Sequence, residues 1–277
     1  MTESVWEEAR SALAEPDPWI KCERVQALWA SVKDRPERLQ AADKPSWSTD
    51  QLPCGQPEAP QLIPPHELPR RGLGTVEGRV ALIHAIAHIE FNAINLGLDA
   101  ACRFDQMPDG AQPNDPGHFY WDWLSVAADE ARHFLMLSGR LSQLGAKYGD
   151  LAAHDGLWAM AVKTEHDVLI RMALVPRVLE ARGLDVTPGM IDKLNQAKDH
   201  DTVGLLEIIL EEEEAHVTIG TRWFRYCCGL RGLEPDSTFD ELLNSYFKPP
   251  PKGPYNEPAR RRAGFSEAEL ARLRKNG

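Results

Sequence analysis

Two copies of a Glu-x-x-His motif are the most chemically informative feature of the sequence. They are Glu130–His133, in the run EARH, and Glu213–His216, in the run EEAH. Side chains three residues apart on a helix lie on the same face, with Cβ atoms about 5–6 Å apart. The glutamate and histidine of each motif can therefore reach the same metal ion or a bridged pair. Because composition alone would give about one such match by chance, the motifs need support from their surroundings.

That support comes from the helix faces on which these glutamates lie. Around Glu90, Glu130 and Glu213, nearly all positions three, four and seven residues away are apolar or small. Examples are Trp123, Phe134, Ile209, Val217, Ile86 and Ile94. A buried carboxylate is costly unless it is paired or coordinates a cation, so three of them on core-facing stripes indicate a shared divalent metal. Glu90 taken alone could instead pair with an arginine.

A fourth carboxylate is needed, because ferritin-like di-iron bundles take single glutamates from two helices and Glu-x-x-His from the other two. Glu165 and Glu180 compete for this role. Glu165 has the more apolar stripe, whereas Glu180 has a proline and an arginine on its face. Spacing favours Glu180, which lies 33 residues before Glu213, close to the 40 residues between Glu90 and Glu130; Glu165 lies 48 residues before Glu213. Either choice is geometrically possible.

Helical periodicity around the motifs predicts an all-α, ferritin-like four-helix bundle, with no sustained strand alternation. Its four long helices are expected over 80–104, from Asp115-Pro116 to 144 with Gly145 as the stop, from about 155 to 182 with Gly183 as the stop, and from a cap at Asp201 to about 228. Thr187-Pro188 should start a shorter helix that ends near residue 198.

Additional segments flank this bundle. The sequence divides into N-terminal helices with a Pro-rich connection packing on the bundle (1–70), the bundle itself (71–247), and a Pro-rich basic tail with a short helix (248–277). The first helix should run from about Val5 to Ala14, because Ser4 and Glu7 form a capping box. Asp17-Pro18 should start the second, and Ser266 with Glu269 the last.

The basic run Arg260–Arg262 has two interpretations. The simpler one is a tail that is solvated or ion-paired on an acidic bundle, and the alternative is a phosphate site.

Composition limits the class of protein. The 277 residues suffice for one large domain or two small ones, and the net charge of -11 disfavours nucleic acid as a partner. The N-terminus does not resemble a signal peptide, and no stretch approaches the roughly 18 uncharged apolar residues of a membrane span. Five cysteines without a CxxC motif indicate reduced thiols. We therefore expect a cytoplasmic protein that is not in the membrane.

The sequence also resembles an uncharacterised bacterial family of ferritin-like di-metal carboxylate proteins. The resemblance covers roughly residues 70 to 265 and is carried by HAIAHIEFNAINLGLDAACRF, DEARHF, YGDLAAHDGLW, RMALVPRVLEARGLDVTP and EEEEAHVTIGTRWF. It implies a di-metal carboxylate site and makes Glu180, in LEARGLD, the ligand of the third helix. The EAR at 180–182 is also similar to a motif of the di-iron tRNA hydroxylases.

These observations combine into one predicted site with the ligands Glu90, Glu130, His133, Glu180, Glu213 and His216. Four carboxylates and two imidazoles suit iron or manganese, so we expect two iron ions, with manganese as the alternative at one or both positions. Glu130 and Glu213 are the natural bridging ligands, because each has a neighbouring histidine for one metal.

The predicted function is an oxidoreductase that activates dioxygen to oxidise an unknown organic substrate, either a small molecule or one bound to a carrier. A homodimer is compatible with this prediction. The alternatives are an iron-binding, ferroxidase or storage protein, a tRNA-modifying hydroxylase, and a metal-free helical scaffold.

Overall fold

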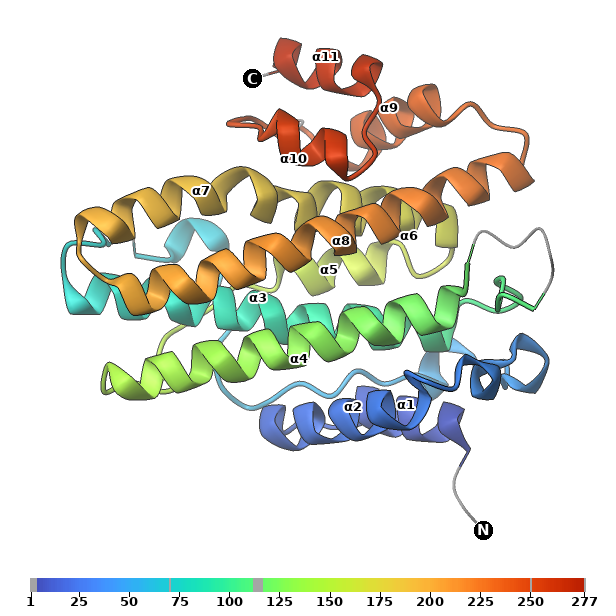
Figure 1. Ribbon diagram of the computed structural model, residues 1–277, viewed down its shortest axis with the longest axis horizontal. Coiled ribbons are helices and arrows are strands. Elements are labelled where there is room, and N and C mark those ends of the chain that lie inside the picture. Colours follow the sequence, from blue (N-terminus) through green and yellow to red (C-terminus); the bar gives the residue numbers. More distant parts are fainter. Residues whose placement is uncertain (1–3, 70, 112–116, 250, 277) are drawn as a thin grey trace. The chain divides into compact units, whose positions relative to one another are not determined.

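The computed structural model describes residues 4–69, 71–111, 117–249 and 251–276, and in these ranges it contains helices but no β-strand (Figure 1). The predicted all-α class is therefore confirmed. The chain forms two compact units, Met1–Trp158 and Ala159–Gly277. The five cysteines are free thiols, as expected.

The core of the first unit is an antiparallel pair of long helices, α3 (Val76–Arg103) and α4 (Phe119–Gln143). Gly97 allows their backbones to approach closely. A Cβ atom at Gly97 would lie 2.8 Å from the Trp123 carbonyl oxygen and 2.9 Å from the Ala127 Cβ, closer than real Cβ contacts. Glu90 lies two turns before Gly97 on α3, and Glu130 lies one turn after Ala127 on α4. Because the two helices are antiparallel, this packing brings Glu90 level with Glu130.

Two N-terminal helices, α1 (Val5–Ala14) and α2 (Pro18–Val32), pack on this pair. Both begin where the sequence predicts, because each cap is local: the Ser4 side chain accepts from the Glu7 N–H, and Asp17 accepts from two N–H groups of the first turn of α2. Gln26 Nε2 on α2 donates to the Ala128 carbonyl on α4 at 2.6 Å. The helices therefore cover an outer face of the long pair.

The described part of α4 begins after the predicted start at Asp115-Pro116. Asp115-Pro116 lies outside the described residues, and the described helix begins at Phe119, where His118 Nδ1 accepts from the Trp121 N–H. Its end agrees with the prediction, since Gly145 follows with φ +77, a conformation that favours glycine. The Pro-rich connection contains no α-helix in its described part, as expected. The short 3₁₀ turns of this unit are η1 (Pro36–Leu39), η2 (Ala41–Asp43), η3 (Thr49–Gln51) and η4 (Pro65–Glu67).

Helix α3 meets a length and composition criterion for crossing a membrane, with a mean hydropathy of 1.2 in its most apolar window. However, 67% of that window is buried inside the protein. The helix also buries Glu90, Asn95 and Asp99. It is therefore mainly a buried core helix of this unit.

The third predicted helix is wrong as a single element. In place of one helix over 155–182 there are α5 (Gly156–Lys163), α6 (Val168–Leu174), a π-helical turn η5 (Val175–Glu180) and α7 (Ala181–Gln196). The first break has a local cause. Thr164 Oγ1 donates to the Met160 carbonyl at 2.8 Å, and the Asp167 carboxylate accepts from the Leu169 N–H at 2.8 Å, which caps a new helix.

The predicted stop at Gly183 and restart at Pro188 are also wrong, because α7 continues through both residues. Pro188 has no N–H to donate to the Leu184 carbonyl four residues earlier. The tail replaces that bond: Asn256 Nδ2 donates to the Leu184 carbonyl at 3.1 Å. A residue that lies 72 positions after Leu184 in the sequence therefore supplies the hydrogen bond that Pro188 cannot make.

Helix α8 (His200–Leu230) packs antiparallel along α6, η5 and α7. Its cap is Asp199, whose carboxylate accepts from the Thr202 N–H, and the predicted cap Asp201 lies inside the first turn. Gly220 provides the close approach. A Cβ there would lie 2.3 Å from the Pro176 ring in η5.

Three short helices complete the second unit: α9 (Pro235–Tyr246), α10 (Glu257–Arg262) and α11 (Glu267–Asn276). The sequence predicts α11 correctly, through reciprocal hydrogen bonds between Ser266 and Glu269, but does not predict α9 or α10. The basic run is ion-paired, as the simpler interpretation expects. Its pairs are Arg260–Asp185, Arg261–Glu267 and Arg262–Glu214.

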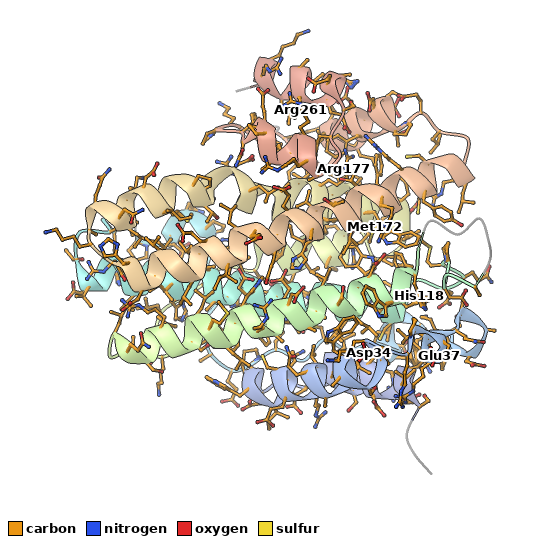
Figure 2. All side chains as sticks on the ribbon, in the orientation of Figure 1. Asp34, Glu37, His118, Met172, Arg177 and Arg261 are labelled. Carbon is orange, nitrogen blue, oxygen red and sulfur yellow. The ribbon has the colours of Figure 1, made fainter. Side chains whose placement is uncertain are left out.

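A buried arginine of η5 contacts α9, α11 and the turn before α11. The guanidinium of Arg177, labelled in Figure 2, lies 4.1–4.6 Å from the ring centres of Phe224, Phe239 and Phe265. It also pairs with Glu269 of α11 at 2.5 Å. Cation–π contacts and a charge-assisted hydrogen bond thus replace the water that the guanidinium loses on burial.

The close approach at Gly220 predicts opposite effects for one substitution at two positions of α8. Gly220→Ala should lower the free energy of unfolding by about 1–3 kcal/mol, because Pro176 must move. Gly204→Ala, where a Cβ meets nothing within 4 Å, should raise it by about 0.5–1 kcal/mol. Urea denaturation followed by circular dichroism measures both. Equal effects of the two substitutions would contradict the contact.

Candidate metal centre

The first unit brings three of the predicted ligands together. His133 Nδ1 on α4 lies 3.1 Å from Glu90 Oε2 on α3 and 3.2 Å from Glu130 Oε2 on its own helix. Ligand atoms of the three side chains lie within 4.8 Å of one another. All three side chains are buried, with Glu130 and His133 at 0% exposure. This group could hold a metal ion.

The electrostatics of this group favour a proton on both Glu90 and His133. Burial, followed by the charge and hydrogen bond of Glu130, raises the pKa of Glu90 well above its usual range. Burial opposes the charged form of His133, but hydrogen bonds and charges from Glu130 and Glu90 outweigh it and raise the pKa to about 11. Glu90 is therefore held in its protonated form and His133 in its charged form, with the Glu130 carboxylate beside both.

The second unit contains a matching set. Glu213 and His216 are three residues apart on α8, with His216 Nδ1 3.8 Å from Glu213 Oε1. Glu180 is the last residue of the π-helical turn η5. It follows Pro176 by four residues, and His216 precedes Gly220 by four. Because Pro176 and Gly220 are in contact and the helices are antiparallel, Glu180 and His216 lie at about the same level. All three side chains are buried.

The structure separates the two candidates for the fourth carboxylate. Glu165 lies in the turn between α5 and α6 and is only half-buried. The apolar stripe predicted around it does not form, because the helix is interrupted there and Val162 is 50% exposed. Glu180 is buried in η5, and single π-helical turns inside α-helices are frequent at functional sites.

A hydrogen-bonded network on the side of α3 opposite Glu90 is not predicted by the sequence. Asn92 Nδ2 lies 3.1 Å from His88 Nε2, and His88 Nδ1 lies 2.9 Å from the Tyr148 hydroxyl. The Tyr148 ring meets the Phe134 ring edge-on at 4.9 Å. Since Phe134 directly follows His133, the network supports the helix segment that carries this ligand. Tyr148 lies in a connecting segment, where no periodic pattern could identify it.

The donor chemistry fits a hard or borderline divalent metal. Carboxylate oxygens and imidazole nitrogens suit iron, manganese and zinc, and the metal binds only after the proton on each donor has left. These features define an all-helical protein with a buried carboxylate–histidine cluster that could hold a metal ion.

The chain belongs to the family described as "Protein of unknown function (DUF455)", whose model matches residues 14–271. It is 43% identical over 270 residues to a protein of Haemophilus influenzae named "Uncharacterized protein", and this covers 96% of the chain and 92% of that protein. No solved structure matches the chain.

The raised pKa values predict how the metal-free protein responds to pH. The folded pKa of Glu90 exceeds its unfolded value of 4.5, and that of His133, about 11, exceeds 6.5. These two groups therefore bind more protons in the folded state than in the unfolded state between these limits, and the stability that they contribute falls as pH rises. In chelator-treated protein, the Tm of the wild type should therefore fall relative to that of a variant without the Glu90 carboxylate from about pH 5 to about pH 9.

Glu90→Gln provides the matched comparison. It removes the ionisation of Glu90 and one of the carboxylates that raise the pKa of His133, so its Tm should depend less steeply on pH. Thermal denaturation in a series of buffers measures both slopes. Identical slopes for the two metal-free proteins would show that Glu90 is already ionised in the fold.

Proposed function

We propose that the chain is a di-iron oxidoreductase with a ferritin-like bundle, which activates dioxygen to oxidise an organic substrate. The supporting observation is that each unit contains the same arrangement: a buried Glu-x-x-His on one long helix, and a single buried glutamate on the antiparallel helix segment beside it. Ferritin-like di-iron proteins combine two such arrangements in one site. Either unit alone offers only half of that ligand set.

In this proposal the six residues of the two arrangements would hold two metal ions. Iron is favoured and manganese is the alternative. Two such ions supply the redox chemistry with which dioxygen is reduced by two electrons. The side chains bind and orient the metals, and their burial keeps bulk water from the reaction. Glu90 holds a proton until a metal arrives, so metal binding should release protons.

Two features favour an oxidoreductase over the alternatives. The outer face of the α3–α4 pair is covered by α1 and α2, whereas a cage-forming storage subunit would need outer faces for packing against its copies. Arg260, Arg261 and Arg262 are each paired with a carboxylate of the same unit. They are therefore poorly disposed to bind the phosphates of a tRNA. We propose a small or carrier-bound substrate and a cytoplasmic location.

Metal content tests the ligand set. Protein purified from iron-replete cells should contain about two metal ions per chain, mainly iron. Glu180→Ala should reduce this to one ion or none, whereas Glu165→Ala, in the turn before α6, should retain both. Elemental analysis measures the ions. Absence of transition metal even after anaerobic reconstitution with ferrous iron would exclude the site, and loss of metal only in the Glu165 variant would reassign the fourth ligand.

Dioxygen consumption tests the activity. The ferrous protein, mixed with oxygenated buffer, should consume about one dioxygen per two iron ions and then stop, because each iron supplies one electron. An oxygen electrode with successive additions of ferrous iron measures the stoichiometry. Continued uptake of iron far beyond two per chain, with growth of a mineral core, would indicate storage. Inertness to oxygen for hours would leave a structural metal site.

A further inference from the structure

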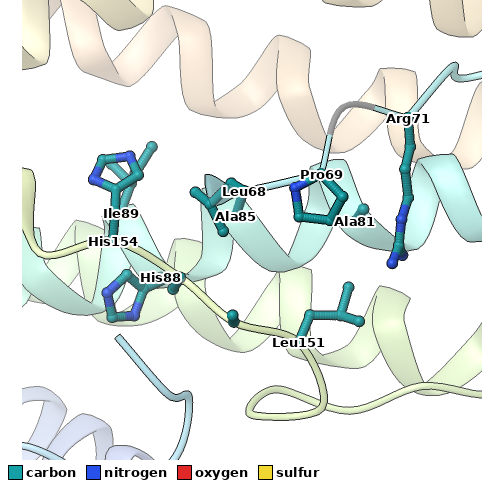
Figure 3. Close-up of a pocket in the computed structure, with 11 residues that line it drawn as sticks. Leu68, Pro69, Arg71, Ala81, Ala85, His88, Ile89, Leu151 and His154 are labelled. Atoms are coloured by element: carbon teal, nitrogen blue, oxygen red, sulfur yellow. The ribbon is translucent and has the colours of Figure 1, made fainter. Parts of the chain in front are cut away.

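A separate cavity lies on the side of α3 that faces away from Glu90. Its volume is about 180 Å³, and it is lined by α3, by the connecting segment 151–154, and by Leu68, Pro69 and Arg71 (Figure 3). Ala81, Ala85, His88 and Ile89 recur at helical spacing and so share one face of α3, about half a turn around the helix from Glu90. The cavity is therefore distinct from the metal-binding cluster.

One wall of this cavity is held in place by hydrogen bonds. The Ile63 N–H donates to the Ala153 carbonyl at 2.9 Å, and the Ala153 N–H donates to the Gln61 carbonyl at 3.0 Å. These bonds tie the wall segment 151–154 to residues 61–63, which lie outside the cavity. A ligand would therefore not have to order this wall.

One end of the cavity is closed by His88, whose ring nitrogens are both engaged. Asn92 Nδ2 donates to the His88 carbonyl at 3.0 Å, which fixes the orientation of that amide. His88 Nε2 faces the same NH₂ group and must accept, so in the neutral ring Nδ1 carries the proton and lies 2.9 Å from the Tyr148 oxygen; the backbone of His154 also hydrogen-bonds to this ring. His88 therefore presents ring carbon rather than a hydrogen-bonding atom to the cavity.

Positive charge and one hydrogen-bond donor are placed at the two ends. Arg71 lies at the end opposite the imidazoles of His88 and His154, with Leu68, Pro69 and Ala85 between (Figure 3). Arg71 is exposed and forms no ion pair with a carboxylate in the described part of the chain, although, besides hydrogen bonds to the Glu77 carboxylate, its charge is one of the causes that lower the pKa of Glu77. His154 Nδ1 accepts from the Gly156 N–H at 3.1 Å, so the proton of its neutral ring is on Nε2 and available to a ligand.

We propose that this cavity binds a small organic acid, with its carboxylate at Arg71 and an apolar body along the alanine, leucine and proline wall. An apolar cavity of about 150 Å³ accommodates benzene, so the size here suits one aromatic ring or a chain of about six carbons. An anion is favoured because a guanidinium is the group that pairs best with a carboxylate, in a two-pronged geometry. The site is independent of the proposed metal chemistry.

Benzoate and its uncharged isostere benzamide are the probes, with hexanoate as a flexible acid. Isothermal titration calorimetry on the full chain, both metal-loaded and chelator-treated, should show binding of one acid per chain, with benzamide at least about tenfold weaker. Arg71→Gln should weaken benzoate at least about tenfold without changing benzamide. Arg35→Gln, an equal charge change at an exposed position outside the cavity, should change neither.

A cavity-filling variant tests the location. Ala85 is exposed on α3, so Ala85→Leu should fold with unchanged Tm and metal content but lose both acids. The inference is overturned if neither acid binds at up to about 10 mM. It is equally overturned if benzamide matches benzoate, or if the Arg71 or Ala85 variant binds like the wild type. None of these results bears on the metal content or oxygen consumption that test the proposed function.

Discussion

Removing ionised side chains from water is costly, and both units of this protein do so in their cores. Lys21 in α2 is buried, donates to the Leu13 carbonyl and to Asn95, and has its pKa lowered by burial to about 8. Arg177 is balanced by aromatic rings and Glu269. These two cations thus have neutralising or solvating groups built into the fold. The cluster of Glu90, Glu130 and His133 differs, because burial and the neighbouring Glu130 favour a proton on Glu90 instead of the charged carboxylate.

A metal ion bound to this cluster would have to displace that proton from Glu90. The same constraint accounts for the precision of the helix pair. Gly97 lets α3 and α4 approach, and this approach brings a carboxylate of one helix against the histidine of the other. The same few residues therefore determine both the packing of the two helices and the electrostatics of the cluster in the first unit.

The sequence predicts those parts of the fold that are determined locally. Ser4 and Asp17 begin their helices where expected, since a cap needs only neighbouring N–H groups. The segment after Trp158 could not be predicted in this way. Continuation of α7 through Pro188 depends on Asn256, a distant residue that supplies the missing donor.

The candidate site shows the same division. Apolar helical stripes suffice to predict that Glu90, Glu130 and His133 are buried, because each stripe belongs to an uninterrupted helix. The stripe around Glu165 misleads, since Thr164 and Asp167 end one helix and begin another in its middle. The support that Tyr148 gives from a connecting segment follows from tertiary packing alone, which no local pattern encodes.

The aromatic cage around Arg177 has a consequence for how sequences of this family can diverge. Its guanidinium is held by rings from α8, from α9 and from the turn before α11, and by a carboxylate in α11. Loss of Glu269 alone would leave a buried cation without its counter-charge, and loss of Arg177 alone would leave the reverse. We therefore expect these positions to covary as a set among homologues. Glu180 lies three residues after Arg177 in the same π-helical turn. The contacts that Arg177 makes with the C-terminal helices would therefore also limit how the sequence around Glu180 can change.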